Sequence, residues 1–158
     1  MKLRELMDAF VREAGLGSVG PNDAGAYHLD FDDMTVAFRE TEDASRLLIF
    51  GAIGELPPEG AEIFCRVMLK AMFLEGAVSG AAFSIDPETE RLFLQRQEPL
   101  SDLDLARFKA LVESFVNELE KWRGSVDAFR PVAAEIGKEK TREAEASGEI
   151  SSNGFLKV

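Results

Sequence analysis

The stretch AAFSIDPETERLFLQRQEPLSDLDLARFKALVESFVNELEKW, residues 81–122, joins a hairpin pattern to a long helical pattern. Its first half alternates apolar and polar residues on both sides of the turn residues Asp86 and Pro87, and this period of two is typical of half-buried strands. The alternating apolar residues are Phe83, Ile85, Leu92 and Leu94. Neither apolar face is stable alone in water, so we expect the helix to cover the hairpin.

The second half of this stretch predicts a long amphipathic helix. Ser101 is a good N-cap residue, and Asp104 stands three residues later, at the capping-box position. The apolar residues that recur at helical spacing are Phe108, Leu111, Val112, Phe115, Val116 and Leu119.

The chain before residue 81 predicts two more helices and three more strands. The first helix has its apolar residues between Leu3 and Ala14 and stops at Gly15. Polar turns at residues 32–33 and 40–44 separate the three strands. The remaining predicted elements are strands 27–31, 34–38 and 46–53 and a helix over 59–75. Strand 46–53, RLLIFGAI, is apolar on both faces, which favours a central strand that is covered on both sides.

The helix over residues 59–75 is apolar around most of its circumference and therefore needs cover on two sides. The sheet can cover one side, and a second copy of the same helix is the simplest cover for the other. We therefore predict a homodimer with an interface at Ile63, Val67, Met68 and Met72. The alternative is that the last helix or the tail covers this helix within one chain.

The elements around LFLQRQ (residues 92–97) and LSDLDLARFKALVESFVNELEKW (residues 100–122) resemble the class I type III secretion chaperones of the CesT/Tir type. The resemblance extends over residues 1–122. It implies an α+β fold with a twisted, mostly antiparallel five-stranded sheet and three helices in the order α-β-β-β-α-β-β-α. It also implies a cytoplasmic homodimer without cofactor or enzymatic activity, which binds the N-terminal segment of a secreted effector and keeps it soluble and competent for secretion.

An extended client of this kind would add to a sheet edge and insert apolar side chains into a groove. The candidate groove residues come from the first helix and the first strands, and these residues also suit an ordinary core. They are Leu6, Phe10, Ala14, Leu29, Phe31, Val36 and Phe38. The same architecture occurs in YbjN-like proteins, so a regulatory or general protein-binding module is the alternative function.

The charge of the chain argues against two classes of partner. With 18 Lys and Arg against 29 Asp and Glu, the net charge is −11, which repels nucleic-acid backbones and anionic membranes. No stretch is long and apolar enough to span a bilayer, and the first residues do not form a signal peptide, so we expect a cytoplasmic protein. Cys65, the single cysteine, stands among apolar residues and is interpreted as a buried thiol.

We find no constellation that would support catalysis or metal binding. His28 is the single histidine, and no nucleotide-binding or nucleophile-elbow motif occurs. Asp30, Asp32 and Asp33 lack the glycine and the distal glutamate of an EF-hand loop, so we interpret them as turn and surface residues. We therefore predict neither enzymatic activity, nor a cofactor, nor a metal site.

The helical pattern weakens after Trp122, where Gly124 and Pro131 interrupt it, and Val126, Phe129 and Val132 are expected either to prolong the last helix or to fold back on it. We expect one chaperone-like domain over residues 1–132 and a polar tail over 133–158. Residues 135–149 are polar with mixed charges and are expected to form a frayed helix or a mobile tail.

Overall fold

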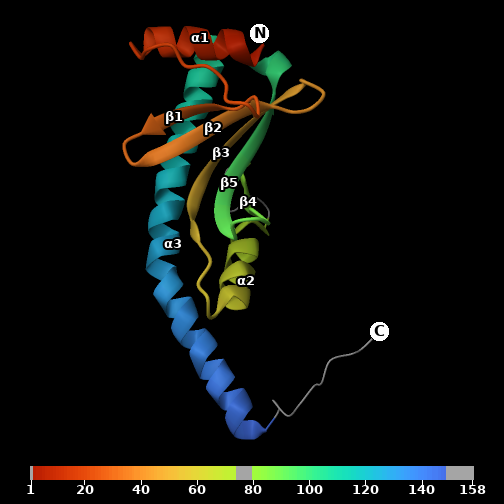
Figure 1. Cartoon of the computed structure of the whole chain (residues 1–158), viewed down its shortest axis with the longest axis vertical. Coiled ribbons are helices and arrows are strands. Elements are labelled where there is room, and N and C mark those ends of the chain that lie inside the picture. Colours follow the sequence, from red (N-terminus) through yellow and green to blue (C-terminus); the bar gives the residue numbers. More distant parts are fainter. Residues whose placement is uncertain (1, 74–79, 149–158) are drawn as a thin grey trace.

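A computed structural model of the chain describes residues 2–73 and 80–148, and Figure 1 shows how the elements are arranged. Within these residues the chain forms three α-helices and five strands in the order predicted from the sequence, which confirms the α+β fold. The elements are α1 (Leu3–Glu13), β1 (Tyr27–Phe31), β2 (Met34–Glu40), β3 (Arg46–Glu55), α2 (Ala61–Ala71), β4 (Ala82–Ile85), β5 (Arg91–Pro99) and α3 (Leu105–Ser147).

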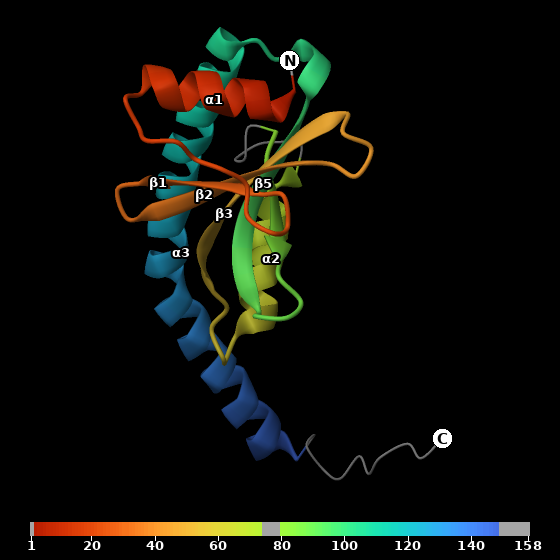
Figure 2. The ribbon, with the colours of Figure 1, turned by 45° about the horizontal axis from the view of Figure 1, so that its top comes forward.

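The strands form one twisted antiparallel sheet in the order β1-β2-β3-β5-β4. β1 and β4 are therefore the two edges, and β3 lies in the centre. In both views the β1–β2 hairpin passes in front of α3, and in Figure 2 β5 also passes in front of α2. The helices therefore lie on one face of the sheet.

The core fills the space between this face and the helices. A row of paired residues crosses all five strands on the helix side, in the order Leu29, Val36, Gly51, Leu94 and Phe83. Gly51 leaves room for Leu119 of α3, because a Cβ at Gly51 would lie only 2.5 Å from a methyl carbon of Leu119. The sheet and α3 therefore approach closely at the centre of the molecule.

Helix α1 crosses α3 at one end of the sheet, as the amphipathic pattern predicts (Figure 1). Its buried residues Leu3, Leu6, Met7 and Val11 belong to the common core. The Phe10 ring meets Phe108 of α3 edge-on, with ring centroids 5.5 Å apart.

The predicted start of α3 at Ser101 is wrong. Residues Leu100–Asp102 form a single 3₁₀ turn, and the α-helix begins at Leu105 with Asp104 as its N-cap. The Asp104 carboxylate accepts a hydrogen bond of 2.8 Å from the backbone N–H of Arg107. A carboxylate that accepts a bond from an otherwise unpaired N–H defines the first turn better than the Ser101 hydroxyl, which donates to Asp102 instead.

Helix α3 is continuous through Gly124 and Pro131 to Ser147, so of the two alternatives for residues after Trp122 the structure shows the one in which they prolong the last helix. A proline inside a helix costs about 3 kcal/mol or more. The helix continues because residues on both sides of Pro131 are buried: Val126 is 1% exposed and Ala133 is fully buried. The domain boundary expected at residue 132 thus falls inside this helix.

The second half of α3 lies antiparallel to α2. The ring of Phe64 in α2 is 5.5 Å from the ring of Phe129 in α3. Nearer the start of α2, a Cβ at Gly137 would lie 2.4 Å from the backbone nitrogen of Gly60. The backbones therefore approach closely at this crossing, and α3 closes one side of α2.

Candidate functional site

The face of the sheet opposite the helices is not covered by any other described part of the chain. Alternate residues of the central strand β3 show the difference: Leu47, Ile49 and Ile53 are at most 2% exposed, whereas Leu48 and Phe50 on the other face are only half-buried. The sequence predicts cover on both faces of this strand. The structure confirms the strand and leaves one of its apolar faces open.

Two aromatic side chains form the floor of this open face. Phe50 of β3 and Phe93 of β5 lie with ring centroids 6.3 Å apart. Both rings line two neighbouring hollows, one of about 370 Å³ that extends toward β1 and one of about 250 Å³ that extends toward β4. The two hollows share these rings and so form one trough across the sheet, which we call the open-face trough.

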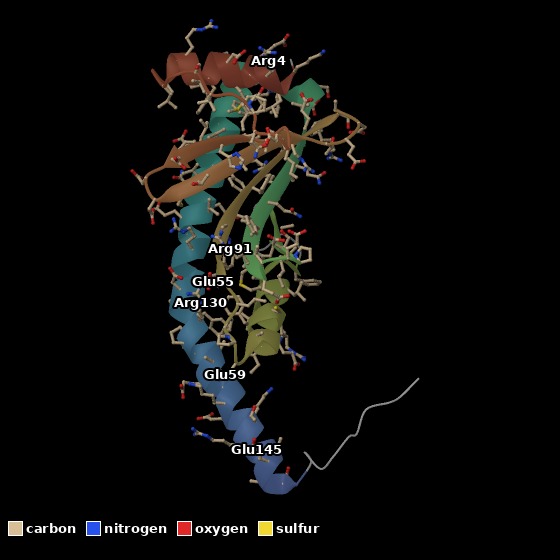
Figure 3. The ribbon with its side chains drawn as sticks, viewed as in Figure 1. Arg4, Glu55, Glu59, Arg91, Arg130 and Glu145 are labelled. Carbon is tan, nitrogen blue, oxygen red and sulfur yellow. The ribbon has the colours of Figure 1, made fainter. Side chains whose placement is uncertain are left out.

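Two arginines that form no ion pair among residues 2–73 and 80–148 flank the open-face trough, although the charge of Arg91 contributes to the lowered pKa of the Asp86 carboxyl. Arg91 lies 6.0 Å from the centre of the Phe93 ring, and its position at the start of β5 is labelled in Figure 3. Arg39 lines the smaller hollow from β2. Both side chains are exposed, so they are available to acidic groups of a bound partner.

The other charges around the trough are already engaged. Arg123 of α3 donates a 2.8 Å hydrogen bond to Asp33, and this bond, together with the arginine charge, lowers the pKa of the Asp33 carboxyl. Asp127 pairs with Arg130 at 3.2 Å. Asp86 accepts hydrogen bonds from the Thr89 hydroxyl and the Glu88 backbone N–H, which lower its pKa. The lining carries three arginines and three aspartates, and of these arginines Arg39 and Arg91 form no ion pair, so they are the positions at which an anionic group of a partner can bind.

Most residues predicted for a client groove lie in the core of this chain. Leu6, Val36 and Phe38 are fully buried, and Leu29 is 5% exposed. Phe10 and Phe31 are partly buried against the same core, and Ala14 caps the C-terminal end of α1 on the surface. The seven positions do not form one open surface within the described structure.

The residues that do line an open apolar surface were not predicted as a site. They are Leu48, Phe50, Ala52 and Phe93. The signal was present in the sequence, because RLLIFGAI is apolar on both faces while the helices suffice to cover only one face of the sheet. A strand of that kind indicates either a second covering layer or a binding surface.

The residues predicted for a dimer interface divide between the core and the surface of α2. Met68 is 5% exposed, and the Met72 sulfur accepts a hydrogen bond from the Phe83 backbone N–H. Ile63 is half-buried and Val67 is 42% exposed. Another side of the helix presents Leu69, which is 66% exposed, and Phe73, just beyond the end of α2, is 75% exposed. A charge placed at Met68 would thus disturb the core of a single chain.

The polar residues weighed for chemistry do not assemble into a reactive site. His28 lines the larger hollow together with Asp33, whose carboxylate is occupied by Arg123. Asp30 accepts a 2.7 Å hydrogen bond from the Thr35 hydroxyl. The Cys65 thiol is half-buried, and its pKa is raised by burial and by the nearby Glu90 carboxylate. Across the described ranges, no three His, Cys, Asp or Glu side chains are grouped closely enough to hold a metal ion.

No helix in the described part of the chain has the length and apolar character needed to cross a membrane. The end predicted for the second helix, residues 74 and 75, and the last part of the predicted polar tail, residues 149–158, lie outside the described residues.

The fold has close counterparts among solved structures. The chain is similar to a chain of the ExsC–ExsE complex, with a TM-score of 0.67 and 24% identity over 77% of this chain and 91% of that chain. It is similar to the Yersinia pestis type III secretion chaperone SycH in complex with a stable fragment of YscM2, with a TM-score of 0.57 and 17% identity over 75% and 97% of the two chains. YbjN from E. coli has a TM-score of 0.57 and 10% identity over 79% and 91% of the chains.

The structural likeness shows the fold, and comparison of the sequence with family models shows the family. A search of curated proteins finds no significant match to the chain. The model of the Tir chaperone protein (CesT) family, however, matches residues 5–123, which include all five strands, α2, the first half of α3 and nearly all of α1. Since this match covers well over half of the sequence, the chain belongs to the Tir chaperone protein (CesT) family.

Proposed function

We propose that this protein is a cytoplasmic homodimeric chaperone that binds the N-terminal segment of a type III secreted effector and keeps it soluble and competent for secretion. Family membership supports the chaperone role, and SycH, which has the same fold, is a type III secretion chaperone in complex with a protein fragment. The single observation that carries the binding role is the open-face trough, an apolar surface on a strand in the centre of the sheet.

The trough suits a client segment with apolar and acidic side chains. Apolar client residues would cover Phe50 and Phe93, and each side chain removed from water contributes about 1.5–3 kcal/mol. Carboxylates of the client would pair with Arg39 and Arg91. A bidentate arginine–carboxylate pair adds direction to this contact. The job requires binding and no reaction.

Two sheet edges extend the same surface. β1 and β4 each pair with one neighbour only, so each presents backbone groups to which an extended client can add as a further strand. Main-chain hydrogen bonds at a sheet edge contribute affinity that depends little on the client's sequence, while the trough favours particular side chains of the client. The two features together fit a client that is unfolded when it is bound.

The homodimer is proposed through the outer face of α2. Val67 of α2 is 42% exposed and Ile63, one turn before it on the same side, is half-buried; neighbouring apolar residues that remain accessible mark interaction surfaces. Of the four residues predicted for the interface from the sequence, Ile63 and Val67 remain in this proposed interface. Met68 and Met72 then support the interface from the core side.

The client-binding role is tested by placing a charge in the trough. We expect Phe50→Asp to reduce recovery of the client at least about tenfold when the tagged protein is purified from its source cells, because burying an unpaired charge costs 1.4 kcal/mol or more. Leu16→Asp is the matched control, since Leu16 is 50% exposed and lies outside the trough. Bound proteins are identified by mass spectrometry, and circular dichroism confirms that both variants are folded.

Equal recovery of the same client by both variants would refute the assignment of the trough. The alternative function is a YbjN-like regulatory or general protein-binding module, which the likeness to YbjN favours at the level of the fold. Recovery of a regulator in place of a secreted protein would support that alternative.

A further inference from the structure

The second half of α3 lies beyond the part of the chain that the family model matches. That match ends at residue 123, and the helix continues to Ser147. We call residues 124–147 the α3 extension. It is an ordered part of the fold, because Ala133 is fully buried and the Arg130 guanidinium donates a 2.9 Å hydrogen bond to the carbonyl of Glu55, as Figure 3 allows the reader to follow.

The α3 extension and α2 form a pair of antiparallel helices whose register is set by two contacts. Gly60 meets Ala133 and Gly137, and Phe64 meets Phe129. Residues that point at the partner helix are thus Phe64 and Met68 on one side and Ala133 and Gly137 on the other.

The residue just before each of these inward-facing residues is apolar. Successive residues of a helix are rotated by about 100°, and in an antiparallel pair this rotation carries both sets to the same side of the pair. That side is the one away from the sheet, because Arg130 and Cys65, rotated the other way, lie near β3 and the β4–β5 turn. The four residues brought together are Ile63, Val67, Val132 and Ile136.

These four residues form an apolar strip that no other described part of the chain covers. Val67 is 42% exposed and Val132 is 51% exposed, while Ile63 and Ile136 are half-buried. Leu69 is also exposed, but it lies on another side of α2 beside Arg66 and Lys70, so it is not part of the strip. Of the six large apolar residues that the described chain exposes most, three lie on this pair of helices: Val67, Leu69 and Val132.

The charge on the two helices indicates what covers the strip. Helix α2 has two basic residues and one acidic residue, and the α3 extension has four basic and five acidic residues, so together they are neutral. The whole chain carries a net charge of −11. Two copies of so acidic a protein repel each other across most surfaces, but not across this one.

We propose that a second copy of this chain covers the strip, so that the α3 extension of each protomer widens the α2 interface into a four-helix layer. The inference rests on the proposed homodimer through α2. Helix pairs with an apolar strip bury it by packing two pairs together around a two-fold axis.

The test compares single charges at three positions in the purified full-length chain, with the mass measured by sedimentation equilibrium over a series of concentrations. We expect Val132→Asp to weaken the dimer at least about tenfold, since a carboxylate would be buried without a partner. Val67→Asp reports on the α2 interface itself. Thr141→Asp is the matched control, because Thr141 is an exposed residue on the opposite side of the α3 extension.

Each outcome decides between the two levels of the proposal. If the unaltered chain is a monomer throughout the series, the proposed homodimer fails and the inference fails with it. If Val67→Asp weakens the dimer and Val132→Asp behaves like Thr141→Asp, only the role of the α3 extension is refuted. If Val132→Asp leaves the dimer intact but lowers client recovery, the strip holds the client instead. Circular dichroism of the Val132→Asp monomer then tests whether its helix content equals that of the unaltered chain, so that loss of the dimer can be distinguished from loss of the fold.

Discussion

Single side chains decide where the helices of this protein begin. Ser101 and Asp104 are both good N-cap residues, and the sequence pattern favours the serine. Asp104 is the N-cap of α3 because residues 100–102 form a 3₁₀ turn before it. The residue that ends this turn, Leu103, is 8% exposed and belongs to the core. Burial of one leucine thus moves the start of α3 by a full turn.

This assignment predicts different effects of two similar substitutions. Asp104→Ala should lower the free energy of unfolding by about 1 kcal/mol, because the N–H of Arg107 loses its partner. Ser101→Ala should change it by less than about 0.5 kcal/mol, as expected for an exposed residue away from special features. Urea unfolding at one fixed protein concentration measures both. A larger effect at Ser101 than at Asp104 would contradict the helix start described above.

Among the elements, α3 departs furthest from what its sequence predicts. Gly124 and Pro131 are ordinary signals for the end of a helix, and the sequence alone leaves open whether the residues around them prolong the helix or fold back on it. Both lie inside a continuous helix because α2 and β3 form a surface on which Val126 and Ala133 are buried. Tertiary contacts have overridden local propensity, as they commonly do.

The two glycines of the α3 extension give a test of this explanation. Nothing lies within 4 Å of a Cβ placed on Gly124, so Gly124→Ala should raise the free energy of unfolding by about 0.5–1 kcal/mol through helix propensity alone. A Cβ on Gly137 would lie 2.4 Å from the backbone of Gly60, so Gly137→Ala should lower it by about 1–3 kcal/mol through overpacking.

Both variants are compared by urea unfolding at the same concentration, because the stability of an oligomer depends on concentration. Stabilisation by both alanines would show that the α3 extension does not rest on α2.

Much of the fold is predictable from periodicity, and the binding surface is not. Alternation in residues 27–31 and 92–94 and the stripe along residues 3–14 were enough to predict the strands and α1. The sequence pattern predicts that the strands around Phe38 and Phe50 carry apolar residues. It does not predict which of the two side chains lies on the face that the helices cover. That depends on the register between β2, β3 and α3, which brings Leu119 onto Gly51 and leaves Phe50 on the opposite face.

As a whole, the molecule is a sheet with helices on one face and, on the other, a trough that has an aromatic floor and a mixed polar and apolar lining. The chain is acidic, yet the trough is flanked by Arg39 and Arg91, which form no ion pair in the described structure. A second neutral, apolar surface lies along α2 and the α3 extension. We assign the first surface to the client and the second to another copy of the chain, so that one molecule can hold both partners at once.

The most direct test of this account is to trap the occupant of the open-face trough. A photo-crosslinking benzoylphenylalanine replaces Phe50 in one variant and Leu16 in another, and each protein is irradiated with its co-purified client. The account predicts adducts between the client's N-terminal segment and position 50, with few or none at position 16. Adducts at position 16 alone, or equal adducts at both, would contradict it.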